Sequence, residues 1–131
     1  MSVQNTSCIE HSVHGVNVVI TILEERIRDH EKVTEIKEAM TEVVSSNACK
    51  NLIIDMGRVQ FIGSIGFLAF LAMRRVPGVQ NVVLCSLNEN VKELFMICRL
   101  IPSANVSSAP FQDSASVQSA LDWCDDGGLG V

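Results

Sequence analysis

The first half of the chain alternates strand-like apolar runs with a segment of helical periodicity. Val13–Leu23 is rich in β-branched residues and has Gly15 at a turn position, which predicts two short strands joined as a hairpin. Asn51–Asp55 is a compact apolar run and predicts a buried strand. Between Arg28 and Asn47 the apolar residues recur at three- and four-residue spacings and predict an amphipathic helix. Its buried face is expected to carry Val33, Ile36, Met40, Val43 and Val44.

The second half repeats this alternation. Ser64–Arg75 is apolar nearly all round and predicts a largely buried helix, and Asn81–Cys85 predicts another buried strand. Asn88 is a favourable N-cap for a helix reaching Cys98 with Val91, Leu94, Phe95 and Cys98 on its apolar face. A short strand is expected near Ala104–Ser107, then a last helix from about Ser114 to Cys124 capped by Asp113.

Strands that alternate with helices predict an α/β fold, in which helices pack against a sheet. The opening hairpin is antiparallel, whereas helical crossovers join parallel strands, so the sheet is expected to be mixed. A chain of 131 residues fits one domain. We therefore expect a single domain over residues 1–131, with a core from about 9 to 124 and a flexible C-terminal tail over 125–131.

Composition and charge limit the classes of partner and the cellular location that the protein is expected to have. Hydrophobic residues make up 47% of the chain and charged residues 19%, which is typical of a globular protein. The net charge is −5 and the basic residues are scattered, which disfavours nucleic acid as a partner. The start of the chain is polar and no apolar run has the length of a membrane span, which indicates a cytoplasmic protein with no membrane contact. The five cysteines are odd in number and widely spaced, so they are expected to be buried thiols.

Candidate catalytic and metal-binding residues are few. Cys8, His11 and His14 are metal-ligand types at regular intervals, but in a strand His11 faces the side opposite to the other two. No metal site is therefore expected. The sequence has no phosphate-binding loop, no dinucleotide fingerprint and no nucleophile elbow. We expect a protein that is not an enzyme and that needs no cofactor.

The segment Leu52-Ile-Ile-Asp-Met-Gly-Arg-Val-Gln-Phe-Ile-Gly-Ser-Ile-Gly-Phe-Leu68 carries a family resemblance. A buried strand that ends in Asp55, a short Val-x-Phe element and a serine-containing turn before a helix are similar to the signature of STAS domains. Val82–Phe95 and the following Arg99-Leu100 resemble the next strand and helix of that family. The resemblance spans roughly Val16–Leu121. It implies a STAS-like fold and the function of an anti-sigma factor antagonist, which binds an anti-sigma factor of the ATP-binding serine kinase type.

In that family the turn reads Asp-Ser-Ser-Gly and the second serine is phosphorylated by the partner kinase. Here the turn reads Gly63-Ser64-Ile65-Gly66, so Ile65 occupies the usual acceptor position and Ser64 is the hydroxyl that remains. The family's Gly-x-Leu-Asp element after the early strand is replaced by residues 23–29. The resemblance thus makes Ser64 the phospho-acceptor candidate and extends the expected partner surface over Arg58 and the turn residues Gly63, Ser64, Ile65 and Gly66.

Each of these residues also has a structural interpretation. Asp55 can accept backbone N–H bonds from the turn that follows its strand, and Ser64 can serve as a helix N-cap without any regulation. Gly66 is unfavourable in a first helical turn unless a neighbouring backbone or a partner approaches closely. The rival function is a stand-alone STAS module that binds a small ligand, a nucleotide or a lipid, or that acts as a scaffold. A monomer or weak dimer is expected.

Overall fold

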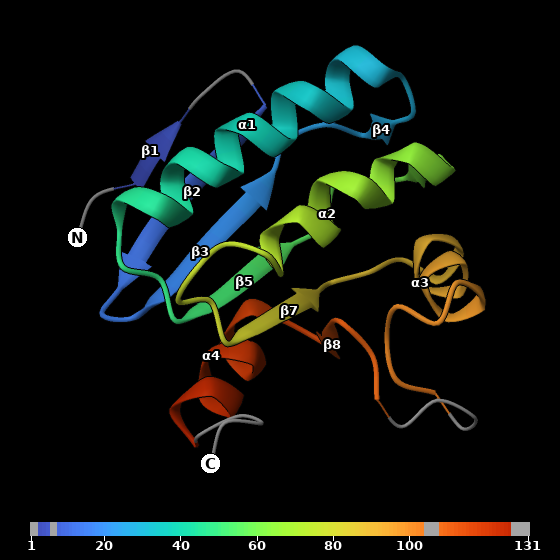
Figure 1. Ribbon diagram of the computed structural model, residues 1–131. Helices are drawn as coiled ribbons and strands as arrows, with labels where there is room; N and C mark the ends of the chain where they lie inside the picture. The colour runs from blue at the N-terminus through green and yellow to red at the C-terminus, as the bar shows by residue number, and fades with distance from the viewer. Residues whose placement is uncertain (1–2, 6–7, 104–107, 127–131) are drawn as a thin grey trace.

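A six-stranded mixed sheet forms the centre of the molecule (Figure 1). The structure is a computed structural model that describes residues 3–5, 8–103 and 108–126. Along the sheet the strand order is β1-β2-β3-β5-β7-β8, and a separate parallel pair joins β4 and β6. The strands are β1 (Val3–Asn5), β2 (Ile9–His14), β3 (Asn17–Ile22), β4 (Arg26–Ile27), β5 (Asn51–Asp55), β6 (Phe61–Ile62), β7 (Asn81–Cys85) and β8 (Gln112–Ser114).

Helices cover both faces of this sheet. They are α1 (His30–Ser46), α2 (Phe67–Met73), α3 (Glu89–Ile97) and α4 (Val117–Asp125), and a 3₁₀ turn, η1 (Ser64–Gly66), precedes α2. In Figure 1, α1 and α2 lie on one face, α4 lies on the other, and α3 lies beyond the C-terminal ends of β5 and β7. The parallel strands β3, β5, β7 and β8 therefore deliver their C-terminal ends to the edge where η1 and α3 begin.

The predicted α/β fold and mixed sheet are confirmed. β2 and β3 form the expected hairpin around Gly15, whose φ of +68° suits a residue without a side chain. The first strand of this hairpin, β2, begins at Ile9 rather than Val13. α1 begins after Asp29, whose carboxylate accepts the Lys32 N–H at 2.8 Å, and all five predicted face residues are buried.

The main core lies between the sheet and the helices α1 and α2. Aromatic rings meet there around Phe95, which packs edge-on against Phe67 at 4.7 Å and against Phe111 at 6.1 Å between ring centroids. A second, smaller core lies under α4 and includes Ile53, Val83 and Cys124. Burial on both faces explains why β5 and β7 are continuous apolar runs.

Several sequence expectations are wrong at the level of single elements. Asp113 is not a helix cap: it lies in β8, and α4 begins after Ser116, whose hydroxyl accepts the Ser119 N–H at 3.1 Å. The tail was expected from residue 125, but Asp125 still belongs to α4. Cys98 is exposed, whereas the other four cysteines are buried as expected.

Four short strands, β1, β4, β6 and β8, were not predicted, because two or three residues are too few to show an alternating pattern. The strand expected over Ala104–Ser107 lies outside the described residues.

Candidate partner-binding surface

The C-terminal end of β5 is closed by a turn that Asp55 organises. The Gly57 N–H donates to Asp55 Oδ1 at 2.9 Å, and the Met56 N–H donates to the carbonyl oxygen of Cys85 at 2.9 Å. The first bond closes a turn on the Asp55 side chain, and the second ties the turn to the neighbouring strand β7. Arg58, the next residue along, is thereby exposed at the edge of the sheet.

Asn88 fastens this turn to the start of α3. Its Oδ1 accepts the Val91 N–H at 2.8 Å and caps the helix, while its Nδ2 donates to the carbonyl oxygen of Val59 at 3.0 Å. One side chain therefore uses both ends of its amide, and each bond satisfies a backbone group that would otherwise need water. The turn after β5 and the N-terminus of α3 are consequently held side by side.

The Gly63–Gly66 turn is fixed from the other side by β4. β4 and β6 pair in parallel, and the Gly63 N–H donates to the carbonyl oxygen of Ile27 at 2.8 Å. Gly66 has a helical φ of −62°, so backbone freedom does not explain it. A Cβ at this position would lie 2.6 Å from Ile62 Cγ1 and 3.1 Å from the Ile27 carbonyl oxygen. The close approach that the sequence suggested is therefore a contact inside the fold.

Ser64 is not the helix N-cap. Gly63 occupies the cap position, and Ser64 is the first residue of η1. Its side chain is exposed, and among the described residues its hydroxyl has no hydrogen-bond partner. Ile65 is half-buried and packs against the main core. In this turn Ser64 therefore presents an exposed hydroxyl group, while the neighbouring Ile65 contributes to the core.

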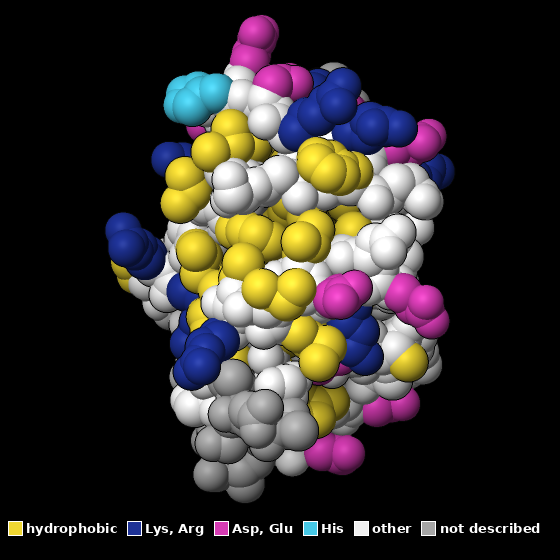
Figure 2. Space-filling model, turned by 90° about the vertical axis from the view of Figure 1, so that its right-hand side faces the viewer, with side chains coloured by type: hydrophobic (Ala, Val, Ile, Leu, Met, Phe, Trp, Pro, Cys, Tyr) yellow, Lys and Arg dark blue, Asp and Glu magenta, His cyan; other side chains and the backbone are white. Residues whose placement is uncertain are grey.

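Exposed apolar side chains gather beside this turn. Figure 2 shows hydrophobic side chains across the middle of the face that carries α3. The large exposed hydrophobic residues on the elements of this face are Phe61 (41% exposed), Leu68 (59%), Met96 (39%) and Ile97 (69%), which we call the apolar patch. Phe61 was expected to be core, whereas Phe67 and Phe70 are buried as expected. An exposed patch of this kind is typical of a surface that meets another molecule.

Basic side chains border the apolar patch. Arg26 and Arg28 flank Ile27 of β4, and Arg58 follows the β5 turn; all three are exposed. Arg28 adjoins the Gly63–Gly66 turn, because a Cβ on Gly63 would lie 3.5 Å from Arg28 Cα. Among the described residues, none of these three arginines forms an ion pair. Glu25 and Asp29 are exposed next to these arginines in the chain, so this end of the sheet carries charges of both signs.

The titratable groups near this edge do not form a reactive centre. Burial, and secondarily the charge of Asp55, raises the pKa of the Cys85 thiol to about 12, so Cys85 is a protonated thiol at neutral pH. His14 lies at the opposite end of the sheet, paired with Asn17, and 3.0 Å separates its Nε2 from Ser12 Oγ. In the described part of the chain, no three His, Cys, Asp or Glu side chains are placed to hold a metal ion. The residues at this end of the sheet can therefore bind a partner through apolar contacts, hydrogen bonds and charged side chains.

The structure brings the expected site residues together at one edge and adds others. Arg58, Gly63, Ser64, Ile65 and Gly66 all lie on segments that follow β5, as sequence order requires. The sequence also favours a contribution from the helix Asn88–Cys98, which is α3 here, whereas it does not single out the β4 arginines. No local pattern identifies them, because β4 has two residues and joins the site only through its pairing with β6.

The model of the STAS domain family matches residues 13–116. This chain belongs to the STAS domain family. Among curated proteins, no sequence matches it. No helix within the described ranges is long and apolar enough to cross a membrane.

Solved structures share the STAS fold at low identity. The anti-sigma factor antagonist SpoIIAA in its unphosphorylated form is 20% identical, with a TM-score of 0.62 over 89% of this chain and 97% of that one. The Bacillus cell fate determinant SpoIIAA in its phosphorylated form is 19% identical, with a TM-score of 0.60 over 88% of this chain and 98% of that one. An anti-sigma-factor antagonist (STAS) domain protein from Planctomyces limnophilus is 19% identical, with a TM-score of 0.65 over 89% of this chain and 97% of that one. These likenesses establish the fold of this STAS domain.

Proposed function

We propose that this STAS domain is an anti-sigma factor antagonist that binds an anti-sigma factor of the ATP-binding serine kinase type. The observation that carries the proposal is the apolar patch beside the Ser64 turn, together with exposed arginines that form no ion pair within the described ranges. Desolvated apolar side chains supply most of the affinity of such an interface, while charges at its rim govern the encounter rate. The likeness to solved anti-sigma factor antagonists supports the same role. The proposal places the protein in the cytoplasm and assigns it no catalysis of its own.

The binding test uses a purified anti-sigma kinase from the same organism, immobilised with ATP and Mg²⁺. Replacement of Leu68 by Ser is expected to raise Kd roughly tenfold or more, because it removes an exposed apolar anchor with little effect on the fold. Arg58→Glu should lower the association rate and make it less sensitive to salt. The matched control is Arg75→Glu, an exposed arginine after α2. Equal affinities for wild type and Leu68→Ser would remove the patch from the interface.

We further propose that Ser64 is the residue through which a kinase controls this surface. Its hydroxyl is exposed and free of hydrogen bonds among the described residues, and Ile65, at the position the family phosphorylates, carries no hydroxyl. A phosphate on Ser64 would bring close to two negative charges next to the apolar patch and to Arg28. It would thereby raise the cost of desolvating the interface and weaken partner binding.

Phosphorylation is tested by intact-mass spectrometry after incubation with the kinase and ATP. One phosphate is expected on wild type and none on Ser64→Ala. Ser64→Asp should bind the kinase more weakly than Ser64→Asn, which has the same size without the charge. An unchanged mass, or equal binding by these two variants, refutes control at Ser64 and leaves the binding proposal to be judged by the Leu68 experiment.

A further inference from the structure

Three asparagines line up across the sheet at the N-terminal ends of β3, β5 and β7. The parallel register sets Asn17, Asn51 and Asn81 side by side, and all three are buried. Asn81 Nδ2 donates to Asn51 Oδ1 at 2.8 Å, and Asn51 Nδ2 donates to Asn17 Oδ1 at 2.8 Å. Asn17 Nδ2 then donates to Asp125 Oδ1 at 3.3 Å. We call this row the amide ladder.

Asp125 fixes the direction of the amide ladder. An ionised carboxylate only accepts hydrogen bonds, so Asn17 must turn its NH₂ group toward Asp125 and its oxygen toward Asn51. Asn51 must in turn donate to Asn17, and Asn81 must donate to Asn51. The oxygen of Asn81, the amide farthest from Asp125, is then left without a donor from the row. Each donated bond also strengthens the acceptor oxygen of the same amide. Asn81 Oδ1 is therefore an acceptor polarised by the whole row and its terminal charge.

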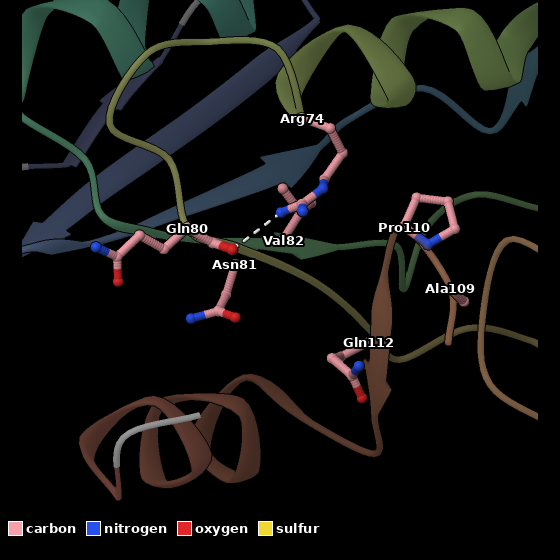
Figure 3. Close-up of a pocket in the computed structure, with 7 residues that line it drawn as sticks. All are labelled: Arg74, Gln80, Asn81, Val82, Ala109, Pro110 and Gln112. Atoms are coloured by element: carbon pink, nitrogen blue, oxygen red, sulfur yellow. Dashed lines mark hydrogen bonds between the residues drawn. The ribbon is translucent and has the colours of Figure 1, made fainter. Parts of the chain in front are cut away.

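This oxygen has no partner within the described part of the chain, although Asn81 is only 6% exposed. In that part no fully buried side-chain polar atom lacks a hydrogen bond, so Asn81 Oδ1 must be reachable from solvent. Asn81 lines a cavity of about 480 Å³ together with Arg74, Gln80, Pro110 and Gln112. Figure 3 shows the oxygen of Asn81 on the side that faces Gln112.

The cavity combines this acceptor with a cation and an apolar wall. Arg74, at the C-terminal end of α2, donates from Nη1 to the carbonyl oxygen of Gln80 at 3.0 Å, which holds its guanidinium at the cavity and leaves further N–H groups for a ligand. Ala109 and Pro110 supply apolar lining. A ligand that satisfies all three needs a donor for Asn81, an anionic group for Arg74 and a short aliphatic part.

We propose that this cavity binds a free α-amino acid with a small aliphatic side chain. Its ammonium group donates to Asn81 Oδ1, its carboxylate meets the Arg74 guanidinium, and its side chain packs against Pro110. The site lies at the opposite end of β7 from the proposed partner surface, since four strand steps of about 3.3 Å separate Asn81 from Cys85. It is a separate binding function and does not depend on the anti-sigma proposal.

The probe is L-valine, titrated into the ¹⁵N-labelled full chain and followed by amide chemical shifts. Two analogues dissect the recognition: 3-methylbutanoate lacks the ammonium group, and 2-methylpropan-1-amine lacks the carboxylate. Saturable shifts are expected at Asn81 and Gln112 with L-valine, and a roughly tenfold or larger rise in Kd with either analogue. Absence of a saturable shift up to the solubility limit of valine, or equal binding of an analogue, overturns the proposal.

Two pairs of variants at exposed positions test the geometry without disturbing the core. Arg74→Gln should weaken valine binding roughly tenfold, whereas Arg75→Gln, its exposed neighbour, should leave it unchanged. Asp125→Lys replaces the terminal acceptor by a group that only donates, which favours the reversed ladder and turns the NH₂ of Asn81 toward the cavity. Valine should then bind more weakly and 3-methylbutanoate more tightly, while Asp126→Lys changes neither. Wild-type affinity for valine in Asp125→Lys refutes the role of the ladder.

Discussion

Replacing Gly66 by alanine sets two effects of known size against each other. Alanine is better than glycine in a helical turn by about 1 kcal/mol. The added Cβ, however, would lie 2.6 Å from Ile62 Cγ1 and 3.1 Å from the Ile27 carbonyl oxygen. Ile62 is buried, and the Ile27 carbonyl is held by the Gly63 N–H, so neither neighbour can move aside freely. Overpacking of this kind costs about 1–3 kcal/mol, so we expect a net loss of up to about 2 kcal/mol.

Urea unfolding followed by circular dichroism measures this loss. The matched control is Gly63→Ala in the same turn, where the new Cβ would lie no closer than 3.5 Å to its neighbours, so a change within about 0.5 kcal/mol is expected. A double-mutant cycle with Ile62→Ala adds a second check. The cost of Gly66→Ala should shrink when the Ile62 side chain is absent. An unchanged cost of Gly66→Ala in the Ile62→Ala background refutes the steric argument.

Other predictions concern the groups that hold and flank the surface. Asn88→Ala removes the α3 cap and the bond to Val59, and should lower the free energy of unfolding by about 1–2 kcal/mol, measured by urea titration against Asn88→Ser, which keeps the cap. In native protein at pH 8, iodoacetamide should label Cys98 first, and mass mapping that finds Cys85 labelled equally fast would contradict its burial. Because the pKa of Cys85 rises from 9.0 to about 12 on folding, its contribution to stability is complete below pH 9 and is lost as the pH rises toward 12. Cys85→Ala should therefore show a shallower decline over that range.

The sequence by itself determined the elements whose pattern is long enough to read. In α1 five apolar positions recur at the helical period, and all five are buried, because a long amphipathic helix can satisfy its pattern in one orientation only. After their first residues, Asn51 and Asn81, β5 and β7 carry runs of buried apolar side chains, which a strand covered on both faces requires. These elements, with the motif around Ser64, were sufficient to predict the α/β fold and its STAS family.

Tertiary structure decided the features that depend on segments far apart in the chain. β4 and β6 have two residues each and exist only because they pair, and that pairing sets Arg28 beside Gly63 and explains Gly66. Phe61 is apolar in sequence and is nevertheless exposed, because it lies on this outer pair. The amide ladder is the clearest case. In the sequence its asparagines are three unremarkable polar residues at strand starts, and only in-register parallel pairing joins them into one hydrogen-bonded row.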